Sequence, residues 1–472
     1  MSSDATATDV TDGASAATGP VPVGAARAAR ADGGQRATLI GLLMVVTAVA
    51  FEALAVATVM PVVARSLSGL SLYGWAFTAF FITSIVGMVV AGPWSDRAGP
   101  VPAFISGLAV FAAGLLIAGS ATSMPVFIAG RAVQGFGAGE NIVALYVVIA
   151  RVFAEADRPR VFSAISGAWV LPSVVGPAVA GLVAEHVGWR WVFYGLPPFV
   201  VAGLLLLVPA LRGLGPGPAA DGRRMAARWP VALRLAAGVT LLEVAGQRLT
   251  WWSIPLAGAG AVLLVPSLRL LLPAGALRLA RGLPAVVVSR GLLAGAFFGA
   301  EAFLPLDLQT LHHMRPGVAG VPLTVGAIGW FAGSWYQGRL PAGRSRDALV
   351  RQGFALVTAG VAGLVAVTYP GVPGWFAVLC WTVGGAGMGL AMSTVGLLTL
   401  QLSPPGEQGV SSAALQISDA VGSTLCIAVG GALLAVGREA LGTGPVLRLV
   451  FALMAAVAGA GILVSGRTRP AA

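Results

Sequence analysis

Fourteen long stretches of apolar residues follow one another along this chain. A helix needs about 20 consecutive, predominantly apolar residues to cross the hydrocarbon core of a bilayer, and each stretch has about that length. The composition agrees, because 57% of the residues are hydrophobic and only 10% are charged, whereas about a quarter of the residues in soluble domains are charged. The sequence therefore predicts an all-α polytopic membrane protein.

The stretches fall into blocks of six, two and six. We expect the spans at 38–62, 73–93, 102–121, 125–149, 161–184, 191–211, 230–247, 253–272, 284–306, 318–338, 350–369, 375–398, 411–435 and 446–465. The span at 230–247 is the weakest, because it carries Arg234 and Glu243. Arg-rich segments flank this span and its neighbour, so either both of these helices cross the membrane or neither does.

The distribution of Arg predicts which side each end of the chain occupies. All 29 basic residues are Arg; with 14 crossings and an internal N-terminus, twenty lie in cytoplasmic tails and loops and six lie outside. Positive residues accumulate in cytoplasmic loops, so we predict that both termini are cytoplasmic and that the protein lies in the plasma (inner) membrane. The net charge of +11 then reflects topology and contact with anionic membrane lipids, and no nucleic-acid partner is implied.

Weak internal similarity relates the two six-helix blocks. The segment "AGPWSDRAG" from Ala91 resembles "AGSWYQGRL" from Ala332, and "QGFGAG" from Gln134 resembles "VGGAGMG" from Val383. A parallel duplication of six helices, with two helices inserted between the copies, explains both the spacing and the count. We therefore predict a disordered cytoplasmic tail (1–36), an N-terminal six-helix bundle (37–211), a central cytoplasmic loop (212–229), two linking transmembrane helices (230–272), a C-terminal six-helix bundle (273–466) and a cytoplasmic tail (467–472).

Four motifs interrupt the apolar runs of the first block. "FEALAVATVMP" places Glu52 inside the first span, and "GRAVQGFGAG" places Arg131 and Gln134 on one face of the fourth. "GPWSDRAGP" forms a charged turn between glycines after the second span, and "VVGPAVAG" puts a Gly-Pro pair in the fifth, where it bends the helix and permits close packing. Ionisable residues inside a span are costly and usually functional.

Together these motifs resemble those of the major facilitator superfamily, and more closely its fourteen-span drug:proton antiporter branch. "GPWSDRAG" is similar to the family's first-loop signature, "RAVQGFGAG" to its fourth-helix signature and "GPAVAG" to its fifth-helix antiporter signature, while "FEALAVATVMP" is similar to the branch's first-helix signature. The resemblance implies a proton-coupled exporter of amphipathic or lipophilic compounds that works by alternating access. Pro100 and Val101 depart from the pattern, because the family usually has basic residues there.

The proton-coupling pair is expected to be Glu52 and Arg131. At 1.5 Å per residue, Glu52 lies about 9 Å below the outer surface of a 30 Å core and Arg131 about 10 Å below it, so the two depths agree. A purely structural ion pair between the first and fourth helices is the alternative. The conformational-switch residues are expected to be Gly92, Asp96, Arg97, Gly99, Gly176 and Pro177.

The substrate is expected to contact Glu301, Phe297, Phe298, Gln134 and Trp169. A carboxylate among aromatic rings suits a lipophilic cation, and the alternative is a lipid-facing aromatic belt with a snorkelling acid. Glu140 is either a second functional carboxylate or a packing contact between helices. Asp419 is either a relay or a partner for the first-loop turn, and Glu243 is expected to pair with Arg234 or Arg248.

Other classes of function fit the sequence poorly. The chain contains no Lys, so it has no phosphate-binding loop ending in Gly-Lys-Ser/Thr. It shows no nucleophile-base pair and no metal-ligand cluster, and we expect no enzyme activity, no metal and no cofactor. The partners are expected to be a small amphipathic substrate, protons and membrane lipids, with the protein a monomer. A lipid or glycolipid exporter of the same fold, or a non-transporting scaffold or receptor, are the alternatives.

Overall fold

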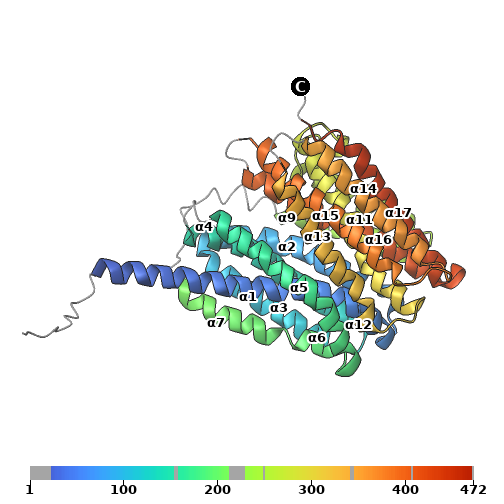
Figure 1. The fold of residues 1–472 in the computed structure, drawn as a ribbon, viewed down its shortest axis with the longest axis horizontal. Coiled ribbons are helices and arrows are strands. Elements are labelled where there is room, and N and C mark those ends of the chain that lie inside the picture. The colour runs from blue at the N-terminus through green and yellow to red at the C-terminus, as the bar shows by residue number, and fades with distance from the viewer. Residues whose placement is uncertain are drawn as a thin grey trace, which may run out of the picture.

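The computed structural model describes residues 23–153, 158–211, 229–247, 250–340, 345–404 and 408–469, and the regular elements of this part of the chain are helices (Figure 1). The first group contains α1 (Val23–Ser66), α2 (Trp75–Ala98), α3 (Pro100–Gly119), α4 (Met124–Val152), α5 (Arg158–His186), the short α6 (Arg190–Tyr194) and α7 (Pro197–Leu211). Two more helices follow, α9 (Trp229–Gln247) and α10 (Ser253–Leu271). The last group contains α11 (Leu283–Thr310), the short α12 (Pro316–Ala319), α13 (Val321–Arg339), α14 (Arg346–Val367), α15 (Phe376–Leu402), α16 (Gln408–Leu441) and α17 (Thr443–Ser465).

Helices occupy all fourteen stretches that the sequence predicts as spans. Twelve helical segments are both long and apolar enough to cross a membrane. The other two stretches are α5 and α9, which have 29 and 19 residues and therefore sufficient length. Twelve candidate spans are thus established by length and composition, and the crossings by α5 and α9 remain predictions.

Two boundaries differ from the sequence-based expectation. Helix α1 begins at Val23, whereas a disordered tail is predicted as far as residue 36; the segment 23–36 is rich in Ala and Arg, which are strong helix formers and extend the helix. The segment "GPWSDRA", predicted as a turn, forms the last turns of α2. The rest of the predicted tail, 1–22, and the central loop, 212–228, lie outside the described residues.

The two six-helix groups repeat one packing pattern. Helix α4 packs between α2 and α3, as α15 packs between α13 and α14. Helix α1 packs on α5 and α7, as α11 packs on α16 and α17. This correspondence is what a parallel duplication of six helices would produce.

Glycines bring the two groups together at one end of the molecule, from which their axes diverge (Figure 1). A Cβ atom on Gly181 of α5 would lie only 2.4 Å from the Cα of Gly317 in α12, and one on Gly74 would lie 2.9 Å from the Cα of Gly431 in α16. Only glycine permits backbones to approach this closely. We call this region the closed end and define it by these two contacts.

Hydrogen bonds also join the groups at the closed end. Arg65 of α1 donates to the side-chain oxygen of Gln309 in α11 over 2.8 Å, and Gln309 in turn donates to the carbonyl of Thr58 over 3.1 Å. The hydroxyl of Tyr73 donates to the carbonyl of Ala302 over 2.8 Å. Both the backbone and the side chains therefore seal this end of the seam between the groups.

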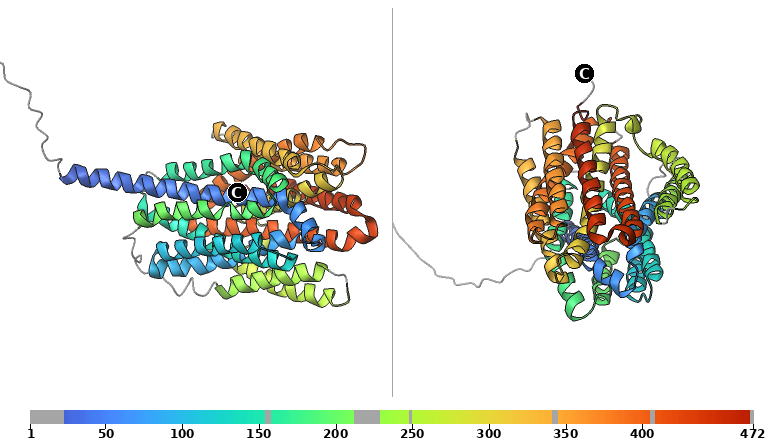
Figure 2. Two further views of the ribbon diagram at one scale, coloured as in Figure 1. Left: turned by 90° about the horizontal axis from the view of Figure 1, so that it is seen from below. Right: turned by 90° about the vertical axis from the view of Figure 1, so that its right-hand side faces the viewer.

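The inserted helices α9 and α10 lie together on one flank of the molecule (Figure 2). Helix α9 packs on α2 of the first group and on α16 of the second. Its Glu243 is buried and accepts a 2.7 Å hydrogen bond from the hydroxyl of Thr78 in α2, while Gly246 packs against Ala432 of α16. The predicted pairing with Arg234 is wrong, because Arg234 lies on the exposed face of α9, and Arg248 lies outside the described residues.

Candidate functional site

The site is built on α4, which is held tightly by its two neighbours. A Cβ atom on Gly135 would lie 2.1 Å from the carbonyl oxygen of Phe80 in α2, and one on Gly137 would lie 2.4 Å from the backbone nitrogen of Phe111 in α3. The glycines of "GRAVQGFGAG" therefore let backbone pack directly on backbone. This packing fixes the position of Arg131, which the same segment carries.

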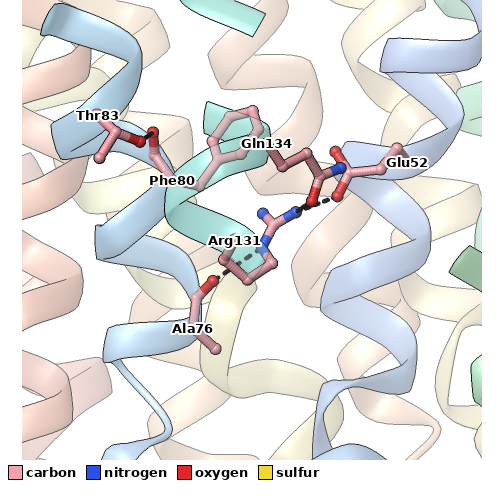
Figure 3. Close-up of polar contacts among 6 residues, drawn as sticks. All are labelled: Glu52, Ala76, Phe80, Thr83, Arg131 and Gln134. Carbon is pink, nitrogen blue, oxygen red and sulfur yellow. Dashed lines mark hydrogen bonds and ion pairs between the residues drawn. The ribbon is translucent and has the colours of Figure 1, made fainter. Parts of the chain in front are cut away.

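Arg131 joins three helices through its guanidinium group (Figure 3). Its Nε donates to the carbonyl of Ala76 in α2 over 3.0 Å. Its Nη1 donates to a carboxylate oxygen of Glu52 in α1, forming an ion pair, and to the side-chain oxygen of Gln134 over 2.6 Å. The guanidinium also lies 4.5 Å from the centre of the Phe80 ring, a cation-π contact. The structure thus brings Glu52 and Arg131 together, as their equal depths in the sequence predict.

This cluster is buried but incompletely satisfied. Only 1% of Glu52 and 3% of Arg131 is exposed. The second carboxylate oxygen of Glu52 and the amide nitrogen of Gln134 have no hydrogen-bond partner. A buried ion pair must repay a large desolvation cost, and this one leaves one carboxylate oxygen of Glu52 without a partner.

Gln134 lies next to the ion pair between Glu52 and Arg131. The sequence suggests that it contacts substrate, but its side chain accepts the Arg131 hydrogen bond beside Glu52. It therefore shares the Nη1 group with Glu52, since this group has two N–H bonds to donate. Gln134 lies beside the Glu52–Arg131 pair, and direct contact with substrate stays a prediction.

A second candidate site lies on α11, where Phe297 and Phe298 precede Glu301 by four and three residues. Phe297, one turn before it, stacks on Trp381 of α15 with 4.5 Å between ring centres and meets Trp330 of α13 edge-on at 5.6 Å. Phe298 also packs near Trp330. Glu301 is buried, and its carboxylate makes no hydrogen bond or ion pair with the residues that the structure describes. A buried carboxylate without a described protein partner, one helical turn from a group of aromatic rings, has the chemistry to bind an organic cation. Trp169 belongs to α5, but its side chain is outside the description.

The predicted switch residues lie in α2 and α5. Gly92, Asp96 and Arg97 are in the final turns of α2, where their side chains lie outside the described part, and Gly99 ends the helix with a φ of 84°, a conformation that favours glycine. In α5, a Cβ atom on Gly176 would lie 3.5 Å from the Phe51 ring.

Pro177 follows Gly176 in α5 and lies at the closed end. A Cβ atom on Gly320, just before α13, would lie 2.9 Å from the carbonyl oxygen of Pro177. The Gly-Pro pair thus lies between α1 of its own group and α13 of the other.

Two further embedded acids have partners within their own groups. Ser106 of α3 donates to Glu140 over 2.9 Å. Arg290 of α11 forms an ion pair with Asp419 of α16 at 3.1 Å. Both arrangements fit a packing contact between helices, and a relay role for either acid stays a prediction.

Asp307 of α11 is a further buried acid that is absent from the residues predicted as sites. Its side chain is fully buried and neither carboxylate oxygen has a hydrogen-bond partner. The signal was present, because Asp307 is an acid in an apolar span, only six residues after Glu301. Arg65 and Gln309 give no comparable signal in the sequence, since polar residues are common at the ends of membrane spans in any membrane protein.

Over most of its length the chain is similar to known transporters. The sequence profile of the Major Facilitator Superfamily matches residues 38–425. The multidrug transporter protein MdtP of Bacillus subtilis is 26% identical over 434 residues, which cover 84% of this chain and 74% of MdtP. A probable multidrug-efflux transporter of Mycobacterium tuberculosis is 25% identical over 431 residues, which cover 86% of this chain and 89% of that protein. The fold resembles the crystal structure of a POT family transporter in complex with 5-aminolevulinic acid, with a TM-score of 0.66 at 12% identity over 92% of this chain and 96% of that one.

Proposed function

The chain belongs to the major facilitator superfamily and is a membrane transporter rather than an enzyme, and on this basis we propose that it is a proton-coupled exporter of amphipathic or lipophilic compounds. The names of the two relatives, both multidrug transporters, support multidrug efflux. The observation that carries the coupling is the buried contact between Glu52 and Arg131, in which one carboxylate oxygen is free. We assign the protein to the fourteen-span branch of the family, in the plasma membrane and as a monomer.

The proposed topology makes the closed end extracellular. With both termini cytoplasmic, α1 ends outside, and so do α5 and α11, whose last turns form the contacts of the closed end. The two groups act as the two bundles of an alternating-access transporter, with 37–211 and 273–466 as their limits, and the arrangement described here is the one sealed from outside.

The topology predicts the outcome of a labelling experiment. A single cysteine at Gln247, the last residue of α9, should react with a membrane-impermeant maleimide added outside intact cells, whereas one at Ala220 should react only after the inner face is exposed. Both variants need Cys380 and Cys426 replaced by Ala. Labelling of both positions from the same side would remove α9 and α10 from the membrane.

Protonation of Glu52 provides the link between the proton gradient and the bundles. Once neutral, Glu52 no longer attracts Arg131 by charge, so the contact between α1 and α4 weakens while Arg131 keeps its hydrogen bonds to Gln134 and to the carbonyl of Ala76. The loss of this contact between α1 and α4 changes the relative stability of the outward and inward arrangements. A proton that binds from outside and leaves inside would then drive the export of a bound compound.

The cluster around Glu301 selects the cargo in this proposal. Glu301→Gln should weaken the transport of monovalent lipophilic cations far more than that of neutral compounds, because only the cations lose a charge partner. The measurement is kcat/KM for cationic and for neutral compounds, each compared between the variant and the unaltered protein. Glu439→Gln, which alters an exposed acid of α16, is the matched control. Equal loss for both classes would indicate a folding defect and contradict charge selection.

A single assay tests the function as a whole. The purified protein, reconstituted in liposomes, should move lipophilic cations against their gradient when a pH gradient is imposed. The lumenal pH should change at the same time as the cations move. A panel that also contains neutral drugs and fluorescent lipids separates multidrug efflux from lipid or glycolipid export. Transport of lipids alone would replace the proposed cargo, and no coupled proton movement would contradict antiport.

A further inference from the structure

A groove of about 600 Å³ lies on the membrane-facing side of the second group. Helices α13 and α14 both pack on α15 without packing closely on one another, so they form two walls above an α15 floor. The groove is lined by Ala332, Gly333, Tyr336, Gln352, Ala355, Leu356, Ala386 and Leu390. Its volume is in the range of small-molecule sites, and its lining is almost entirely apolar.

The groove has a definite orientation in the membrane. It is formed by the second half of α13 and the first half of α14, which lie toward the cytoplasmic side in the topology proposed above. Phe331 and Trp335 are exposed beside the groove, as side chains that contact lipid must be. Trp335 and the half-exposed Tyr336 lie near the end of α13, where such amphipathic rings settle at a membrane interface.

Two arginines stand at the cytoplasmic mouth of the groove, one on each wall. Arg339 follows Tyr336 by three residues on α13, and Arg351 precedes Ala355 by four on α14, so each shares a helix face with a lining residue. Both are exposed. Arg339 lies 3.8 Å from the centre of the Trp335 ring, a cation-π contact.

No carboxylate competes for these two charges in the described part of the chain. The acid nearest in sequence to Arg351 is Asp347, one turn away, but Asp347 forms an ion pair with Arg469 at 2.9 Å and accepts a hydrogen bond from Ser345. Neither Arg339 nor Arg351 has an ion-pair partner among the described residues. An apolar groove that ends in two unpaired guanidinium groups matches a molecule with a hydrocarbon chain and a negative head.

We propose that this groove binds an anionic phospholipid of the cytoplasmic leaflet, with an acyl chain between α13 and α14 and the phosphate between Arg339 and Arg351. Guanidinium groups bind phosphate through paired, charge-assisted hydrogen bonds. The assignment of the leaflet rests on the proposed topology, whereas the binding itself does not. The site is separate from the Glu52 and Glu301 clusters, so it would act on the stability of the second bundle and not on cargo selection.

Binding can be measured without transport. The full-length protein in dodecyl maltoside is titrated with dioleoylphosphatidylglycerol or dioleoylphosphatidylcholine, and bound lipid is counted by native mass spectrometry. Phosphatidylglycerol should bind more tightly to the unaltered protein. In the double variant Arg339→Gln/Arg351→Gln its affinity should fall by roughly thirtyfold, the equivalent of about 1 kcal/mol for each Arg near a bilayer surface.

Two further variants decide whether the effect belongs to the groove. Arg278→Gln/Arg281→Gln removes the same charge from exposed positions before α11 and should leave phosphatidylglycerol affinity unchanged. Ala355→Phe fills the groove and should weaken both lipids. The proposal would be overturned if the Arg339/Arg351 variant bound phosphatidylglycerol as tightly as the unaltered protein, or if the Arg278/Arg281 variant lost as much affinity. It would also be overturned if Ala355→Phe had no effect on lipid binding. Since no gradient or drug is used, these results are independent of the proposed efflux.

Discussion

Glu52→Gln is expected to reduce efflux driven by a pH gradient to the level of protein-free liposomes. Gln keeps an oxygen that can accept the Arg131 hydrogen bond, but it cannot take up or release a proton. The coupling step would therefore be lost while the shape of the site is kept. Efflux and lumenal pH are followed together in the same liposomes, and a binding assay in detergent should show substrate affinity within a few-fold of the unaltered protein.

Charge balance needs its own control in this experiment. Removing one member of a buried ion pair typically costs about 3–5 kcal/mol, because the other charge stays buried without a partner. The double variant Glu52→Gln/Arg131→Gln removes both charges and should fold normally but remain uncoupled, and Glu52→Asp should retain part of the activity with a shifted pH optimum. A Glu52→Gln protein that still concentrates substrate and still moves protons together with it would contradict the assignment of Glu52 as the proton-binding residue.

Gly181→Leu is expected to prevent the closed end from forming. A Cβ atom at this position already lies 2.4 Å from the Cα of Gly317, so a larger side chain fits only if α5 and α12 move apart. Overpacking of this kind costs about 1–3 kcal/mol, which shifts an equilibrium by about 5- to 140-fold. Transport should fall by a similar factor, because a cycle needs both arrangements, while substrate still binds.

A reporter cysteine distinguishes an open seam from a misfolded protein. Thr58 is buried, and its carbonyl accepts the Gln309 hydrogen bond at the closed end. Thr58→Cys, with the two native cysteines replaced by Ala, should be protected from an external maleimide and become reactive when Gly181→Leu is added. Gly258→Leu is the control, since Gly258 in α10 has nothing within 4 Å of an added Cβ. Unchanged protection of the reporter would contradict the role of Gly181 in sealing the seam.

The sequence predicts best what depends on length and periodicity. Apolar stretches of the right length predict each long helix, because the bilayer imposes a fixed span on them. The depth of a residue along its helix also predicts the meeting of Glu52 with Arg131, since 1.5 Å per residue is nearly constant. The Arg131 contacts to Ala76 and Gln134 refine that prediction without changing it.

What the sequence misses depends on how helices face one another. Glu243 pairs with Thr78 and not with Arg234, because α9 docks on α2, and no periodicity reveals that partner. The segment "GPWSDRA" is likewise part of a helix, although its glycine and proline favour a turn. The seal formed by Arg65, Gln309 and the glycines of the closed end requires the relative placement of the two groups, which only the structure supplies.

The position of α9 makes the two flanks of the transporter unequal. Because α9 packs on both α2 and α16 and is backed by α10, a compound dissolved in the bilayer meets two helices before it reaches that seam. The opposite flank, where α5 faces α13, carries no inserted helix in the described part of the chain. In the proposed exporter, lipophilic cargo that enters from the bilayer would therefore pass on the side of α5 and α13, because inserted helices cover only the other flank.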